Sequence, residues 1–171
     1  MRISVRGSPP CELAPVRAAT RAAVRPFGLP TGAAVTIAFI SDAQMRQLNQ
    51  RHRGRDRTTD VLSFGQDLPA GAKGRAAVAH LLTDLDGRLE VGDIVISGAQ
   101  AAKQAARRGH ALVREVAFLA AHGALHLLGH EDETSAGFRE MVSLGTAAIA
   151  SAGLIPAAAA NQSGPARVRR T

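Results

Sequence analysis

The stretch ALVREVAFLAAHGALHLLG, residues 111–129, constrains the fold of this chain more than any other segment. It reads as a single helix closed by Gly129, and apolar side chains occupy nearly every face of that helix. A helix without a polar face has to be surrounded by other elements, so we expect it at the centre of the fold. Two histidines, His122 and His126, stand within this apolar helix, and their imidazoles are costly to bury without partners.

The remainder of the chain reads as short strands mixed with helices. Strands are predicted at 2–6, 34–40, 61–64 and 90–97, and helices within 12–27, from 41 to about 50, at 98–109 and at 134–153. Because the last three strands are not separated by regular helices, a pure βαβ array does not fit. We predict an α+β fold, with a small mixed sheet of about four strands packed with helices around the central histidine-bearing helix. The glycine-punctuated residues 65–89 are expected to form a mobile loop, in which AAVAHLL (76–82) is either a small helix or irregular.

Length and composition indicate one domain that works in the cytoplasm. The chain has 171 residues, of which 46% are hydrophobic, and this is enough for a sizeable core. No apolar run approaches the roughly 20 residues of a membrane span, and the N-terminus has no signal-peptide pattern. The single cysteine, Cys11, excludes an internal disulfide framework and a cysteine-rich zinc site. Residues 1–155 are expected to form the domain, and residues 156–171 a basic disordered tail.

The basic charge of the chain is carried almost entirely by arginine. The formal net charge is +7, and Lys73 and Lys103 are the only lysines. Arginine suits phosphate recognition, although a GC-rich genome also raises the arginine, alanine and glycine content together. Because the chain has no Trp, no Tyr and only five Phe, a stacking platform for single-stranded bases is not expected. If RNA is the partner, we expect contacts through backbone charge and shape.

The histidines of HGALHLLGHEDE, residues 122–133, have the spacing of a metal site. His122 and His126 lie one helical turn apart and can bind one ion together. His130 would lie about 12 Å from His122 along a straight helix, too far to share that ion. Gly129 is placed to end the helix, after which a ligand could turn back to the metal. The candidates for that third ligand are His130, Glu131, Asp132 and Glu133, and imidazole with carboxylate suits zinc.

One position argues against peptide hydrolysis. Zinc peptidases with the HExxH pattern carry a glutamate general base directly after the first histidine. Here that position is Gly123. A metallopeptidase is therefore the less favoured function for this metal site.

At this point the sequence resembles a known family. HGALHLLGHED (122–132) is similar to the hallmark motif of the YbeY family of bacterial endoribonucleases, and LNQRHRGRDRTTDVLSF (48–64), GDIVIS (92–97) and REVAFLAAHG (114–123) agree with that family in order and spacing. The resemblance spans roughly residues 33–150. It implies a zincin-like fold and one zinc ion. It also implies a single-strand-specific, metal-dependent endoribonuclease that acts in 16S rRNA 3′-end maturation and ribosome quality control. Precursor rRNA in the small subunit would be the substrate, and ribosomal proteins or GTPases are candidate partners.

The chain departs from the family at one ligand. The family pattern resembles H-G-x-L-H-x-x-G-x-D-H, with a third zinc-binding histidine ten positions after the first. By position, the resemblance makes His122 and His126 ligands and places Asp132 where the third histidine stands. A carboxylate is an ordinary zinc ligand, so Asp132 is the favoured third ligand. His130 is the alternative, which keeps three imidazoles but breaks the spacing.

The resemblance also singles out an arginine. Arg53 matches the family's arginine for RNA cleavage and would clamp a phosphate or stabilise transition-state charge. Arg51, Arg55 and Arg57 stand beside it and are expected to bind substrate. No general base is evident, although Glu131 or Glu133 could serve if the loop turns inward. A non-catalytic zinc-containing ribosome-assembly factor is the alternative function.

Overall fold

The computed structural model describes residues 1–156. In chain order the elements are β1 (Arg2–Arg6), α1 (Leu13–Val24), the 3-10 helix η1 (Arg25–Phe27), β2 (Ala34–Ile40), α2 (Asp42–Arg53), β3 (Val61–Gly65), α3 (Arg75–His80), β4 (Glu90–Ser97), α4 (Gly98–Arg108), α5 (Leu112–Leu127) and α6 (Ser135–Ser151). Residues 157–171 lie outside the described residues. The division into a domain of 1–155 and a basic tail of 156–171 therefore stays a prediction.

The four strands form one mixed sheet, which confirms the predicted α+β class. Their order is β1-β2-β4-β3. β1 pairs with β2 and β2 with β4 in parallel, while β3 runs antiparallel to β4. Each predicted strand and helix is present. Helix α2 extends past its expected end near Gln50 to Arg53, because Gly54, in a left-handed conformation at φ +64°, ends it there.

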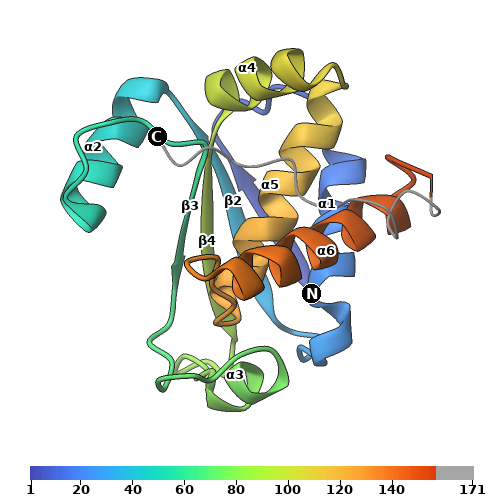
Figure 1. Ribbon diagram of the computed structural model, residues 1–171. Helices are drawn as coiled ribbons and strands as arrows, with labels where there is room; N and C mark the ends of the chain where they lie inside the picture. Colours follow the sequence, from blue (N-terminus) through green and yellow to red (C-terminus); the bar gives the residue numbers. More distant parts are fainter. Residues whose placement is uncertain (157–171) are drawn as a thin grey trace.

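Helix α5 lies at the centre of the fold, as its apolar sequence predicts. It packs against β3 and β4 on the sheet and against α1, α4 and α6 around it (Figure 1). Side chains along the whole helix, including those of Val116, Leu119 and Leu125, are buried. Helix α2 lies on the other face of the sheet, where Met45 packs against Leu62 and Val95. Within residues 1–156, no helix combines the length and the apolar character needed to cross a bilayer.

Residues 66–89 are more structured than the sequence suggests. The segment contains α3, and the side chain of Gln66 bonds the backbone of Leu82 and Glu90. The amide of Gly74 donates to the carbonyl of Leu128 at 2.8 Å. We expected a mobile loop here because the glycines leave no periodicity. The bonds that tie the segment down come from residues distant in sequence, and periodicity does not reveal them.

Helix α5 approaches the sheet closely at Gly123. A Cβ atom at this position would lie 2.6 Å from Cγ2 of Ile94 and 3.0 Å from Oγ of Ser63. The Ser63 hydroxyl donates to the Gly123 carbonyl at 3.0 Å. A larger residue would require a shift of the helix or of Ile94. The packing at this position therefore favours glycine over the glutamate of the HExxH pattern.

We predict that Gly123→Ala destabilises the protein by about 1–3 kcal/mol, the cost of inserting a methyl group into a filled core. The loss should appear in urea unfolding monitored by circular dichroism, although alanine is the better helix former. Gly32→Ala is the matched control, because a Cβ atom there meets nothing within 4 Å. Equal stability of the Gly123→Ala variant and the wild type would show that the helix is not held at this distance.

Candidate metal centre

Three side chains converge at the C-terminal end of α5. The Nε2 atoms of His122 and His126 lie 3.2 Å apart, and Oδ2 of Asp132 lies 3.7 Å from Nε2 of His122. One ligand atom from each of the three residues lies within 4.8 Å of the others. Two nitrogens that each lie 2.0–2.1 Å from a tetrahedral zinc ion are about 3.4 Å apart. The spacing of the two imidazole nitrogens is therefore close to that of a zinc-binding pair, and the carboxylate lies near enough for the three residues to hold a metal ion.

A backbone carbonyl sets the orientation of His126. Its Nδ1 atom lies 2.8 Å from the carbonyl oxygen of His130. Because that oxygen only accepts hydrogen bonds, Nδ1 carries the proton and Nε2 keeps its lone pair. The lone pair of His126 is thus on the atom that faces His122. This is the usual arrangement for a metal-binding histidine, whose second nitrogen donates to a carbonyl or carboxylate.

The protonation states of His126 and Asp132 also favour the binding of a metal cation. Burial, followed by the charge of His122, lowers the pKa of His126 to about 4. The hydrogen bond from His122 is the largest cause that lowers the pKa of Asp132 to about 2. At neutral pH His126 is therefore neutral and Asp132 is ionised. Metal ligands must be deprotonated, and these two groups are already in that state.

The turn after α5 brings Asp132 back to the helix. Gly129 adopts φ +75°, and a Cβ atom there would overlap the carbonyl oxygen of Ala72. Beyond the turn, the His130 side chain points away from the other two histidines and packs 5.0 Å from the ring of Phe27. The group therefore contains Asp132, the favoured candidate, and not His130. Glu131 and Glu133 are exposed and also lie outside the group.

Arg53 ends helix α2 and its side chain is exposed. Its charge is the smallest of the causes that lower the pKa of His126. The segment that follows is anchored, since Asn49 donates to the carbonyl of Arg57 at 2.7 Å. Asp56 accepts two hydrogen bonds from Arg46. The three neighbouring arginines expected to bind substrate, Arg51, Arg55 and Arg57, are likewise exposed on this basic segment.

A groove that the sequence did not reveal lies beside the basic segment. It has a volume of about 330 Å³ and is lined by Arg6, Thr36, Ala38, Leu48, His52, Phe64, Asp93 and Val95. The rings of His52 and Phe64 meet nearly edge-on, with centroids 4.8 Å apart. These residues come from four strands and one helix, so no local sequence motif predicts the groove. The groove combines one basic side chain, Arg6, one acidic side chain, Asp93, and the rings of His52 and Phe64.

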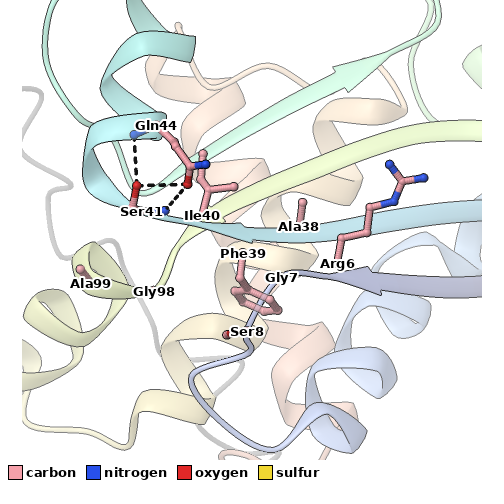
Figure 2. Close-up of a pocket in the computed structure, with 10 residues that line it drawn as sticks. All are labelled: Arg6, Gly7, Ser8, Ala38, Phe39, Ile40, Ser41, Gln44, Gly98 and Ala99. Carbon is pink, nitrogen blue, oxygen red and sulfur yellow. Dashed lines mark hydrogen bonds between the residues drawn. The ribbon is translucent and has the colours of Figure 1, made fainter.

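The larger cavity lies away from the metal group. Its volume is about 600 Å³, and it opens at the carboxyl ends of β1 and β2, near the first turns of α2 and α4 (Figure 2). Ser41 and Gln44, which line it, bond each other as the cap of α2. Leu127, next to the metal group, packs at Gly65 and Gly92, near the opposite end of the sheet. This cavity therefore contributes nothing to the metal centre.

We predict that Asp132→Ala abolishes stoichiometric zinc binding, because it removes the one carboxylate of the group. Metal content after dialysis, measured by plasma emission spectroscopy, should fall from one equivalent to well below it. Glu131→Ala, an exposed carboxylate one residue away, is the matched control and should keep its zinc. Full zinc in the Asp132→Ala protein would refute the assignment of this residue.

Without metal, the protein should lose stability as the pH falls from about 6.5 to 4. The folded state holds His126 neutral, whereas the unfolded imidazole takes up a proton near pH 6.5, so acid favours unfolding. At ~1.4 kcal/mol per pH unit, the contribution of His126 is about 2 kcal/mol between pH 6.5 and pH 5.

The measurement is urea unfolding in the presence of a chelator at pH 7 and pH 5. His126→Gln, which does not titrate, should show a smaller decrease by about that amount. An identical decrease in both proteins would contradict the expected pKa of His126.

Comparison with known proteins places these observations in context. Residues 13–153 match the family described as endoribonuclease YbeY. The chain is 41% identical over 139 residues to the endoribonuclease YbeY of Moorella thermoacetica, covering 78% of this chain and 82% of that protein. It is 35% identical over 133 residues to the Bacillus licheniformis endoribonuclease YbeY, covering 78% and 80%. For Geobacillus thermodenitrificans the values are 42% over 106 residues, covering 62% and 64%.

A solved structure agrees with the fold. The solution structure of a Thermotoga maritima protein superposes with a TM-score of 0.58 at 21% identity, covering 96% of this chain and 99% of that one. At this level of identity the agreement concerns the fold alone.

Proposed function

The chain belongs to the endoribonuclease YbeY family, and we propose that it is a metal-dependent endoribonuclease that cleaves single-stranded rRNA. The family membership confirms the resemblance drawn from the motifs. The observation that carries the proposal is the convergence of His122, His126 and Asp132 into one group that could hold a metal ion.

Zinc is the metal we propose for this group. Two imidazoles and one carboxylate are a donor set that zinc accepts, and three protein ligands leave a fourth position open, as in catalytic zinc sites. When bound, zinc would supply Lewis acidity toward a phosphate oxygen or lower the pKa of a water. The carbonyl of His130 holds His126 in the tautomer that this role requires.

The arginines would handle the charge of the RNA. Arg53 is proposed to hold the scissile phosphate and to stabilise the negative charge that develops in the transition state. Arg51, Arg55 and Arg57 would contact neighbouring phosphates. The groove lined by Arg6, His52 and Phe64 lies on the face of the sheet that α2 covers and would extend this surface. A net charge of +7 supports attraction to the RNA backbone.

The physiological substrate is proposed to be the 3′ end of precursor 16S rRNA in the small subunit. The same activity would serve ribosome quality control in the cytoplasm, with ribosomal proteins or GTPases as partners. Family membership supports these roles. Peptide hydrolysis is not expected, because Gly123 stands where the HExxH pattern has its glutamate base.

We predict that Arg53→Ala lowers the rate of RNA cleavage by about 10²-fold, as expected when one transition-state donor is removed. The assay is cleavage of a 16S 3′-precursor RNA by the zinc-loaded protein. Zinc content should remain unchanged, since Arg53 is not in the metal group. Arg107→Ala, an exposed arginine at the end of α4, is the matched control and should retain wild-type activity.

Two results would contradict this function. Zinc-loaded wild-type protein that cleaves no single-stranded or ribosome-bound rRNA would refute the nuclease. Unimpaired processing of 16S rRNA in cells that carry only the Arg53→Ala protein would favour a non-catalytic assembly factor.

A further inference from the structure

We propose that His130 is a positioning residue of the metal centre. Its buried ring locks the turn that presents the His130 carbonyl to His126 and the carboxylate of Asp132 to His122. The inference rests on the proposed metal site. It assigns to the third histidine of the row a role that is distinct from metal binding.

The ring of His130 is clamped in a closed pocket. Only 3% of the residue is exposed, and its ring is tilted by 45° against that of Phe27 at 5.0 Å. The backbone of Gly74 forms another wall, since a Cβ atom there would lie 2.8 Å from the Phe27 ring and 3.6 Å from Nε2 of His130. Neither ring nitrogen has a hydrogen-bond partner among the described residues. A carboxylate lies nearby, but Oε1 of Glu140 is 3.8 Å from Nδ1 of the ring, beyond hydrogen-bond length. The ring therefore acts mainly through its shape.

Residues 72–74, which include Gly74, also contact the backbone of the turn after α5. The amide of Gly74 donates to Leu128 at 2.8 Å, and Gly129 packs against the carbonyl of Ala72 so closely that no side chain would fit. Lys73, between them, bonds Glu140 of helix α6 at 2.7 Å. Residues 72–74 therefore connect the turn to α6 and lie against the His130 ring.

The backbone of His130 transmits this restraint to the ligands. Its amide donates to the carbonyl of Leu125 at 3.1 Å, and its carbonyl accepts the Nδ1 proton of His126 at 2.8 Å. Asp132 follows two residues later. An aspartate is shorter than a histidine, so its backbone must be held closer to the metal. A turn without its anchor would leave both the tautomer of His126 and the reach of Asp132 unfixed.

The test compares two substitutions that separate shape from ring nitrogens. His130→Leu refills the pocket without a nitrogen, whereas His130→Ala empties it. Zinc affinity is measured by competition with a chromophoric chelator. We expect His130→Leu to bind within about threefold of the wild type and His130→Ala to bind about 10- to 100-fold more weakly, as for other groups that orient ligands. His80→Ala, which removes an exposed histidine, is the matched control and should bind as the wild type does.

Two spectroscopic readouts distinguish positioning from general stability. The visible absorption of the cobalt-substituted protein reports the ligand set, and it should be the same in the wild type and in His130→Leu. Nitrogen-15 NMR of the metal-free protein should show His126 as the Nδ1–H tautomer in the wild type and in His130→Leu, and as a mixture in His130→Ala. Phe27→Leu loosens the same pocket more mildly and should weaken zinc binding severalfold. If His130→Ala does not fold, this variant tests the positioning role in its place.

Three results would contradict the positioning role of His130 or the metal site on which it rests. Zinc loss in His130→Leu equal to that in His130→Ala would make the ring a ligand and overturn the positioning role. Wild-type affinity and tautomer in His130→Ala would show that the turn needs no anchor. A wild-type protein that binds no zinc, with these variants folded, would refute the proposed metal site itself.

Discussion

The close packing of helix α5 on the sheet is the constraint on which the rest of the structure depends. At Gly123 the helix backbone approaches Ile94 and Ser63 so closely that a larger residue would require a shift. This contact fixes the height of the helix above β3 and β4, and with it the position of the histidines on either side of the contact. Helices α1, α4 and α6 then enclose the apolar remainder of α5. The ligand-bearing helix is thus held by the core of the protein, and a site on such a rigid element is positioned more accurately than one on a loop.

Asp132, the third member of the metal group, is held in place in a different way, because it follows the helix. Asp132 stands on a turn, and a turn on the surface has no core to hold it. Residues 72–74 and the ring of His130 supply the missing restraint, through the Gly74–Leu128 hydrogen bond and the contact with Phe27. The segment 66–89, which looks like a connection in the sequence, thereby becomes part of the architecture around the metal centre.

Much of the fold could be predicted because its signals are local. The alternation of β1, the capping box at Ser41 and the left-handed glycines each act within a few residues, and the strands appear where expected. The central position of α5 also followed from its apolar surface. The small helix α3 was only one of two interpretations of its residues, and the anchoring of residues 66–89 could not be predicted, because its hydrogen bonds join residues such as Gln66 and Glu90 that are 24 positions apart. The same holds for the groove around Phe64 and His52, whose walls come from separate elements.

The sequence by itself determined that His122 and His126 share one face of a buried helix and that Gly129 turns the chain back. Helical periodicity and the conformational freedom of glycine act locally, so residue types and spacing suffice to infer them. The spacing within the motif favoured Asp132 as the residue that returns to the histidines, and the tertiary structure shows how it is brought there. Asp132 joins the histidines and His130 packs against Phe27, because the space beside Gly129 is filled by the carbonyl of Ala72. These contacts come from segments more than fifty residues earlier in the chain, and no spacing rule within the motif contains them.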